Sequence, residues 1–245
     1  MKLFRDENTK ESQRDHQSGG EMQDDLYYSQ MTEYYDGAKY DYDFESVRQS
    51  IVERYEKHGP LDNQIIEIIR ESFAGRRVLE IACGAGFWTR YIAEASAYVM
   101  ATDVSRELVT IAQSLVESPK VEFRSLDARD LTSLPSDFDA VFHFNYINHV
   151  PLSDWDNWLD HLHSRLMPDA VVLMGGQAYQ GDEYDEQSGD FYSSRSCPNG
   201  KTYRLVDNYP DEQLVRSHLR GRASDIQYTR EHGWCCIYTV LDNEC

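Results

Sequence analysis

Short apolar runs alternate with amphipathic stretches along most of this chain of 245 residues. The runs are typical of buried strands and are predicted at 77–82, 97–103, 121–127, 139–144 and 170–176. Between them, apolar residues recur at helical spacing and predict helices near 88–96, after Ser105 and at 153–166, where Ser153 to Asp156 resembles a capping box. Strands that alternate with helices are typical of a parallel sheet covered on both faces.

Right-handed crossovers between such strands give a doubly wound fold that binds its ligand at the carboxyl ends of the strands. The C-terminal part has a different pattern. We predict an acidic loop, a short strand, a helix and an antiparallel hairpin at 178–200, 201–206, 210–220 and 224–241. The expected fold class is α/β, a Rossmann-like doubly wound sheet of about seven strands with this hairpin at its C-terminal end.

The N-terminal part is divided by composition. The polar stretch 1–24 is predicted to be a disordered tail, whereas 25–43 holds six tyrosines and is predicted to be an ordered segment packed over the rest. Two helices are predicted at 44–58 and 61–73, separated by Gly59-Pro60. The expected organisation is a tail, an N-terminal tyrosine-rich and helical unit, and an α/β domain, at 1–24, 25–75 and 76–245.

Composition limits the partners and the compartment. The formal net charge is −19, which disfavours binding to a phosphate backbone or an anionic membrane surface. There is no run of about eighteen apolar residues, and the polar start lacks the apolar core of a signal peptide. The five cysteines form no CxxC pair, which argues against a disulfide framework and a zinc site. We therefore expect a cytoplasmic protein with no nucleic-acid partner and no membrane partner.

The stretch "VLEIACGAGFWTR", residues 78–90, joins a predicted strand to a predicted helix through a glycine-containing turn. Gly84 and Gly86 suit a backbone that turns sharply and lets a ligand approach. The helix that follows offers unpaired N–H groups at its start. Asp103 ends the next strand, where a carboxylate suits the hydroxyls of a ribose. Together these features predict a nucleotide or nucleoside site.

The side chains around this turn indicate which ligand it suits. Phe87 and Trp88 are bulky where a bound pyrophosphate needs small neighbours, and Thr89 stands where a dinucleotide turn needs a small residue. Glu80, at the end of the first strand, would repel a pyrophosphate and help accept an ammonium, directly or through hydrogen bonds of the turn. The expected ligand is a nucleoside with a cationic amino-acid end.

These residues carry a resemblance to a known family. "VLEIACGAGFWTRYIAE" resembles the first motif of class I S-adenosylmethionine-dependent methyltransferases, with Ala82 in place of the first glycine. "MATDVS", "SLDARDL" and "FDAVFHFNYINHVP" resemble the family's segments that meet ribose, adenine and the transferred methyl group. The resemblance covers roughly residues 40–177. The C-terminal part and the tyrosine segment are similar to a subgroup that acts on small molecules, in which the tyrosine segment forms a lid.

The resemblance implies S-adenosyl-L-methionine as cofactor and assigns the candidate residues. The expected cofactor contacts are Glu80, Ala82, Gly84, Gly86, Phe87, Asp103, Val104, Asp127, Ala128 and Phe144. Within this set, Asp103 would meet the ribose, Asp127 and Ala128 the adenine, and the backbone near Phe144 the amino-acid end. The expected substrate contacts are Asn145, Tyr146 and Asn148.

Methyl transfer requires alignment and exclusion of water, and it requires a base only where the acceptor arrives protonated. His149 is the candidate base, and the alternative is a structural histidine that orients the loop before Pro151. Tyr28 and Tyr35 are the candidate catalytic tyrosines, forming an aromatic wall near the sulfonium, and the alternative is simple packing. No metal site is expected, because Asp139 stands at the wrong end of its strand.

Other reactive residues are assigned structural roles. His161 and His163 are predicted to lie solvated on a helix surface, and Cys235 and Cys236 to pack on opposite faces of a strand.

The favoured function is S-adenosylmethionine-dependent transfer of a methyl group to an O or N atom of a small molecule. The net charge favours a neutral or cationic acceptor. The alternative is a non-catalytic protein with the cofactor fold that acts as a binding or partner subunit. A nicotinamide oxidoreductase is disfavoured by Glu80 and by the bulky Phe87 and Trp88.

Overall fold

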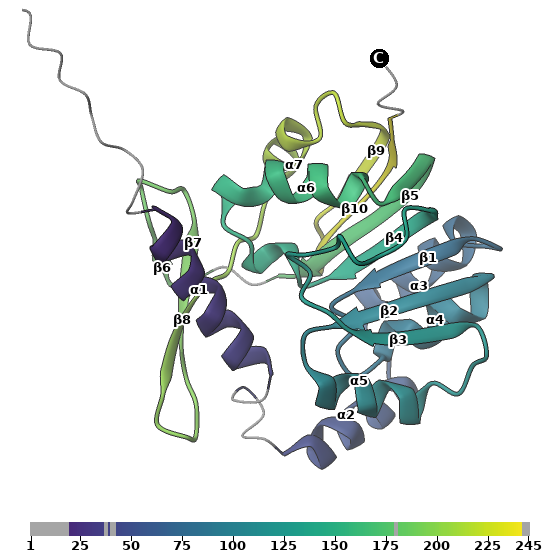
Figure 1. Cartoon of the computed structure of the whole chain (residues 1–245), viewed down its shortest axis with the longest axis horizontal. Coiled ribbons are helices and arrows are strands. Elements are labelled where there is room, and N and C mark those ends of the chain that lie inside the picture. The colour runs from purple at the N-terminus through teal and green to yellow at the C-terminus, as the bar shows by residue number, and fades with distance from the viewer. Residues whose placement is uncertain (1–19, 37–38, 40–42, 179–180, 242–245) are drawn as a thin grey trace, which may run out of the picture.

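A seven-stranded sheet forms the centre of the protein, in a computed structural model that describes residues 20–36, 39, 43–178 and 181–241 (Figure 1). The strand order is β3-β2-β1-β4-β5-β10-β9. The strands are β1 (Arg77–Ile81), β2 (Tyr98–Asp103), β3 (Val121–Ser125), β4 (Phe138–Phe144), β5 (Leu166–Gln177), β9 (Ala223–Thr229) and β10 (Gly233–Val240). The predicted Rossmann-like sheet with its C-terminal hairpin is confirmed.

The pairing of the strands places the functional loops at one edge of the sheet. β1 pairs in parallel with β2 and β4, and β3 and β5 extend the parallel part on either side. β10 is antiparallel to both β5 and β9. Because parallel strands end at the same edge, the turn after β1, the end of β2 and the loop after β4 lie side by side.

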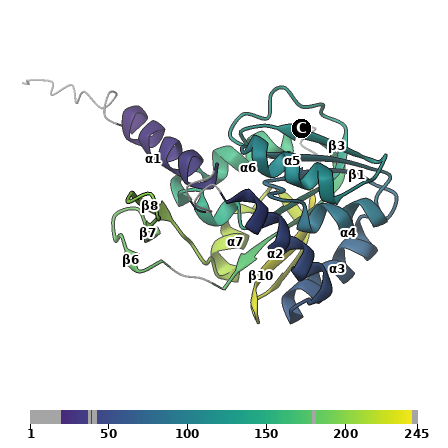
Figure 2. The ribbon, with the colours of Figure 1, turned by 90° about the horizontal axis from the view of Figure 1, so that it is seen from below.

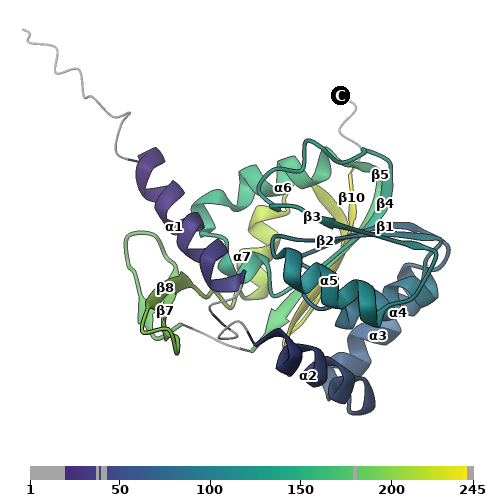
Figure 3. The same ribbon diagram turned by 60° about the horizontal axis from the view of Figure 1, so that its bottom comes forward.

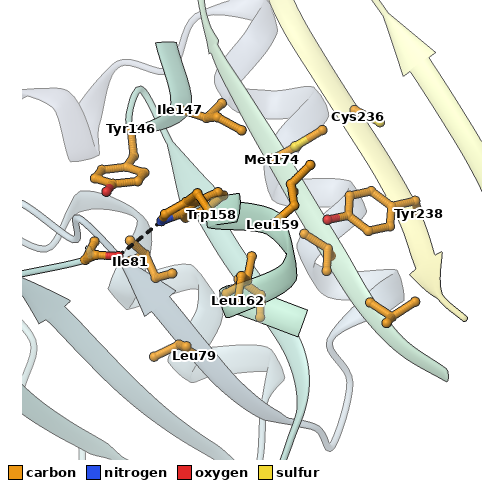
Figure 4. Close-up of a cluster of buried hydrophobic side chains, with 14 of the residues drawn as sticks. Leu79, Ile81, Tyr146, Ile147, Trp158, Leu159, Leu162, Met174, Cys236 and Tyr238 are labelled. Carbon is orange, nitrogen blue, oxygen red and sulfur yellow. Dashed lines mark hydrogen bonds between the residues drawn. The ribbon is translucent and has the colours of Figure 1, made fainter. Parts of the chain in front are cut away.

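Helices cover both faces of the sheet, as Figure 3 shows. One face carries α3 (Pro60–Ser72), α4 (Phe87–Ala95) and α5 (Arg106–Leu115), and the other carries α6 (Trp155–His163) and α7 (Glu212–His218). The buried residues of β10 alternate between the two cores: Cys235 packs with the α3–α4 side and Cys236 with the α6 side (Figure 4). The prediction that these two cysteines pack on opposite faces is confirmed.

The core under α6 is built from the apolar stripe that the sequence predicts. Trp155, Leu159 and Leu162 have no exposed surface and pack on Leu79, Ile81 and other residues of the sheet (Figure 4). Ser105 caps α5 as predicted, since its Oγ accepts a hydrogen bond from the Leu108 N–H at 3.3 Å. Among the described helices, none is both long and apolar enough to cross a membrane.

A small second sheet replaces part of the predicted acidic loop. It consists of β6 (Glu183–Tyr184), β7 (Phe191–Ser196) and β8 (Thr202–Val206), and β7 pairs antiparallel with β8. The prediction of a loop over 178–200 is therefore wrong for β6 and β7. The sequence of β7, "FYSSRS", lacks an apolar alternation, and its strand conformation comes from pairing with β8.

Two local predictions at α6 are also wrong. The N-cap of α6 is Asp154, which makes no capping hydrogen bond, and Ser153 lies in a short 3-10 turn before the helix, so there is no capping box with Asp156. His163 is buried, and its Nε2 lies 2.9 Å from the hydroxyl of Tyr238 on β10. Burial lowers the pKa of His163 to about 4. His163 lies on the face of α6 that packs on the sheet, and the spacing of the apolar residues alone did not indicate this.

The N-terminal helices lie at the edge where the strands end. α1 (Gly20–Tyr35) runs along the small sheet, and α2 (Phe44–Glu56) lies beside α5 (Figures 1 and 2). α1 thus begins inside the stretch predicted to be a tail, and residues 1–19 lie outside the described residues, as do Tyr40 and Tyr42. The division of the chain into three units stays a prediction.

Candidate active site

A cavity of about 290 Å³ opens at the carboxyl edge of the sheet, between the loops of the strands and the N-terminal helices. Its lining falls into two groups. The sheet side contributes the turn after β1, the end of β2 and the segments after β3 and β4, and the other side contributes residues of α1 and α2 together with Lys39. The cavity therefore lies where a doubly wound sheet binds its ligand.

The turn after β1 uses left-handed backbone at three positions. Ala82 has φ 56°, Gly84 φ 56° and Gly86 φ 87°. A Cβ added to Gly84 would meet nothing within 4 Å, so this glycine faces open space and is required by its conformation. A Cβ on Gly86 would lie 3.0 Å from the Cβ of Ala112. Gly86 therefore allows α4 to begin against α5, and it does not line the cavity.

Asp103 closes the other side of this turn. Its Oδ2 accepts a hydrogen bond from the Gly84 N–H at 2.8 Å, and its Oδ1 accepts one from the Ser105 N–H at 3.0 Å. The side chain lines the cavity and is 7% exposed. Burial raises the pKa of Asp103, while the two backbone N–H groups oppose that shift. The carboxylate is thus held in one orientation at the cavity wall.

Glu80 lies beneath the turn and does not line the cavity. Its side chain is 1% exposed, and no donor among the described residues meets its carboxyl oxygens in good hydrogen-bonding geometry. The nearby Thr89 hydroxyl opposes the effect of burial on the pKa of Glu80 only in part. Burial raises the pKa of Glu80 to about 8. A carboxyl group in this position is costly unless a donor reaches it.

The segment after β3 carries the pair predicted to meet adenine. Asp127 and Ala128 both line the cavity. The Asp127 carboxylate is held by the Arg129 guanidinium, whose Nε lies 2.9 Å from Oδ2 and 3.1 Å from Oδ1. The Ala128 carbonyl accepts a hydrogen bond from the indole N–H of Trp158 at 3.1 Å (Figure 4). Arg129 and Trp158 therefore fix both residues of the pair from outside the cavity.

The loop after β4 begins with a left-handed residue, Asn145, at φ 61°. The Oδ1 of Asn145 accepts a hydrogen bond from the Gln177 N–H at 2.7 Å, which ties the loop to β5. Asn145 and Tyr146 line the cavity, whereas the side chain of Asn148 points away from it and donates to the Asn208 carbonyl at 2.9 Å. The loop thus brings two of the three predicted substrate residues to the cavity.

His149 lies at the end of the cavity under α1 and is held at both ring nitrogens. Its Nδ1 lies 2.7 Å from the Val206 carbonyl oxygen, and its Nε2 lies 2.6 Å from the hydroxyl of Tyr35. Because a carbonyl only accepts, Nδ1 carries the proton and Nε2 accepts from Tyr35. Burial lowers the pKa of His149, although Asp207 opposes that shift. His149 is therefore a neutral imidazole whose Nε2 lone pair is directed at the Tyr35 hydroxyl.

The tyrosines of α1 attach this helix to the loop after β4. The Tyr27 hydroxyl donates to the His149 carbonyl at 2.5 Å, and the Tyr28 hydroxyl donates to Asp154 at 2.6 Å. Tyr35 lines the cavity and Tyr28 does not. Burial raises the pKa of Tyr35 well above its ordinary value, so its hydroxyl keeps its proton.

The structure places the predicted residues as follows. The cavity is lined by Ala82, Gly84, Phe87, Asp103, Val104, Asp127, Ala128, Phe144, Asn145, Tyr146, His149 and Tyr35. It is not lined by Glu80, Gly86, Asn148 and Tyr28, which support the wall from behind. The roles assigned to all these residues stay predictions.

Sequence reasoning did not find the contribution of α2. Arg54 of this helix lines the cavity, and its guanidinium carbon lies 3.7 Å from the centre of the Phe87 ring. The same guanidinium donates to Asp62 of α3 at 2.6 Å. The sequence of α2 does not indicate that Arg54 reaches the cavity, because this arginine is placed by its contact with Phe87, which lies far along the chain.

The described residues fit S-adenosylmethionine. Gly84 faces open space, Asp103 presents an oriented carboxylate on the cavity wall, and the start of α4 offers N–H groups nearby. The unpartnered carboxyl of Glu80 lies just behind this turn and suits a cationic ligand group. Phe87 and Trp88 occupy the start of α4 with bulky buried side chains, where a pyrophosphate needs small residues.

Comparison with known proteins agrees with this fit. Residues 78–169 match the family described as a methyltransferase domain. This part of the chain is similar to the methyltransferase domain family. The resemblance stated from the motifs is thereby confirmed, and with it the cofactor of the family.

The similar curated proteins match this domain over a limited length. A ubiquinone biosynthesis O-methyltransferase of Xanthomonas campestris pv. campestris is 38% identical over 85 residues, which are 34% of this chain and 36% of that protein. One from Bordetella avium is 33% identical over 95 residues, 38% of this chain and 39% of that protein. The chain thus spans little more than a third of the length of the curated relatives it matches.

Solved structures extend the likeness of fold to most of the chain. The structure titled "DhpI-SAH complex structure" has a TM-score of 0.66 and 22% sequence identity, and the match covers 89% of this chain and 98% of that one. An S-adenosylmethionine-dependent methyltransferase from Mesorhizobium loti has a TM-score of 0.55 and 12% identity, covering 72% and 96%. The methyltransferase domain shares its fold with both proteins.

Proposed function

We propose that this protein transfers a methyl group from S-adenosylmethionine to an O or N atom of a small molecule. The observation that carries the proposal is a single cavity that is lined by Asp103 and Gly84 and also by Tyr35 and His149. The names of the curated relatives favour an oxygen acceptor.

The cofactor residues have distinct tasks in this proposal. Asp103 would hold the ribose hydroxyls, Asp127 and Ala128 the adenine, and the Gly84 turn with Glu80 behind it the amino-acid end. When bound, the cofactor supplies an electrophilic methyl group on a sulfonium centre. The chain needs to position the acceptor, exclude water and manage one proton.

The proton of a hydroxyl or ammonium acceptor passes to the Tyr35–His149 pair. The Tyr35 hydroxyl already donates to Nε2 of His149, so Tyr35 can accept a proton from the acceptor as it gives its own to the imidazole. The Val206 carbonyl stabilises the imidazolium that results, through the Nδ1–H. α1 covers this end of the cavity and keeps bulk water from the pair.

The test is a transfer assay with methyl-labelled S-adenosylmethionine and a panel of small phenols, carboxylates, alcohols and amines. We expect transfer to one class, and His149→Gln should lower kcat by about 100-fold while the affinity for S-adenosylhomocysteine stays unchanged. Because the pKa of His149 is lowered, the wild-type rate should hold constant as the pH falls to 6.5 and decline only below it.

His161→Gln is the matched control, since the same change on α6 lies outside the cavity and should leave kcat unchanged. No transfer to any acceptor, by a protein that binds S-adenosylhomocysteine, would favour the non-catalytic alternative. An unchanged kcat and pH profile in His149→Gln would leave this histidine with a structural role.

A further inference from the structure

The loop that carries His149 is anchored to the small sheet as well as to the main one. Its first residue is tied to β5, but its later hydrogen bonds go to the start of β7 and the exit of β8. The Leu152 N–H donates to Asp190 Oδ1 at 2.9 Å. Asn148 and Asn208 exchange two hydrogen bonds of 2.9 Å, one from the Asn208 N–H to the Asn148 carbonyl and one from the Asn148 side chain to the Asn208 carbonyl.

Asn208 is the centre of this connection. Its side-chain Nδ2 donates to Asp190 Oδ1 at 2.8 Å, and its Oδ1 accepts from the Phe191 N–H at 2.9 Å. Asn208 is 3% exposed and Asp190 is 1% exposed. With its own N–H and carbonyl bonded to Asn148, every type of polar group of Asn208 is engaged inside the protein. A buried amide with this set of partners tolerates few replacements.

This connection also fixes the position of the Val206 carbonyl, which lies two residues before Asn208 and accepts from Nδ1 of His149. In a neutral histidine, the hydrogen bond that one ring nitrogen makes decides which of the two nitrogens carries the proton. A shift of the 206–208 segment relative to the 145–152 loop would break this bond and release the imidazole from its orientation toward Tyr35.

We propose that Asn208 and Asp190 are positioning residues that hold His149 as the Nδ1–H tautomer, with Nε2 directed at Tyr35 and the cavity. The small sheet then has a task in the site beyond supporting α1, because it carries the carbonyl that selects the tautomer. The catalytic consequence rests on the proposed function, whereas the selection of the tautomer does not.

An exchange of the two side chains tests the proposal. Asn208→Asp places a carboxylate against Asp190 and removes the hydrogen bond between them, whereas Asp190→Asn keeps an oxygen that can still accept from Asn208. The double variant Asp190→Asn/Asn208→Asp restores the lost bond with donor and acceptor reversed. We expect Asn208→Asp to lower kcat by about 10-fold to 100-fold, with little change in affinity for S-adenosylhomocysteine, Asp190→Asn to lower it far less, and the double variant to recover most of the loss of Asn208→Asp.

The second readout is the ¹⁵N NMR spectrum of the histidine rings, assigned to His149 by its loss in His149→Gln. The wild type, Asp190→Asn and the double variant should show the Nδ1–H tautomer, and Asn208→Asp a mixture of both tautomers with an altered titration. The groups that face His149 and contribute to this titration are Asp207, Arg195, Lys39 and Tyr35, all of which are retained in every variant.

The control is Asn199→Asp, the same change in the exposed turn between β7 and β8, which should alter neither readout. If Asn208→Asp does not fold, Asn208→Ala removes the side-chain donor without adding a charge, and the same loss is expected. An unshifted tautomer in folded Asn208→Asp or Asn208→Ala, or no recovery in a folded double variant, would overturn the proposal. If the wild type transfers no methyl group, the proposed function fails while the NMR result still decides the positioning role.

Discussion

At the scale of single residues, Glu80 shows how a site can oppose stability. Its carboxyl group is buried beneath the glycine turn, and among the described residues only the Thr89 hydroxyl opposes the effect of burial on its pKa. Burial raises the pKa of Glu80 to about 8, so the folded protein holds a proton there that the unfolded chain releases above pH 4.5. The free energy of unfolding therefore falls as the pH rises from about 4.5 to 8.

Replacement of Glu80 should separate stability from ligand binding. Glu80→Gln cannot ionise, so its Tm should exceed that of the wild type by roughly 5 °C or more at pH 8 and by little at pH 5. Its affinity for S-adenosylhomocysteine should fall, because the carboxylate that assists the ammonium is gone. Thermal unfolding with and without the ligand measures both effects.

Glu94→Gln is the control, since Glu94 is half-exposed at the end of α4 and pairs with Arg90. If Glu80→Gln has an equal or lower Tm at pH 8, ionisation of Glu80 does not lower the free energy of unfolding, and the prediction is wrong.

Residues whose role depends on local backbone could be predicted from the sequence. Gly84 and Asp103 follow from a strand, a turn and the end of the next strand, and the structure brings them within one hydrogen bond of each other. Gly86 lies in the same glycine turn, but its role is to allow close packing against Ala112 of α5, and the sequence of the turn does not indicate this. The partner of His149 was beyond prediction, because it is the backbone carbonyl of Val206 and every residue offers one.

At the scale of elements, the main sheet could be predicted from local sequence, whereas the small sheet depends on partners that include a helix distant along the chain. The five central strands of the main sheet have buried residues on both faces and show apolar runs, so their place in the sheet could be predicted. β7 is half-exposed and polar, and its strand conformation depends on β8 and on α1. α1 rests on β8 through Tyr34, whose ring centre lies 5.5 Å from that of Tyr203.

Loss of this contact should loosen α1. Tyr203→Ala removes a buried ring between α1 and β8, at a cost of about 3 kcal/mol to the docking of the helix. Amide exchange within 26–36 should then become faster, and KM for the acceptor should rise more than the dissociation constant of S-adenosylhomocysteine. Tyr184→Ala, a change at an exposed tyrosine of β6, is the control. Unchanged exchange in Tyr203→Ala would show that α1 is held by its bonds to the His149 loop alone.

At the scale of the whole molecule, the main sheet, the helices α1 and α2 and the small sheet come together (Figures 1 and 3). The main sheet, α1 and α2 line one cavity, and the small sheet supports His149 through the Val206 carbonyl. The strongly acidic surface surrounds a cavity wall that includes Lys39 and Arg54 as well as Asp103 and Asp127. The long-range charge and the local charge therefore differ, and the acceptor is selected by the local groups.

The central claim is that the Gly84 turn and Asp103 bind S-adenosylmethionine, and calorimetric titration with S-adenosylhomocysteine, beside NADH, tests it most directly. We expect micromolar binding of S-adenosylhomocysteine and none of NADH. Asp103→Ala should weaken the binding by well over 10-fold, because charged hydrogen bonds worth about 1.5–3 kcal/mol are lost. Binding of NADH, or equal affinity of wild type and Asp103→Ala for S-adenosylhomocysteine, would contradict the account.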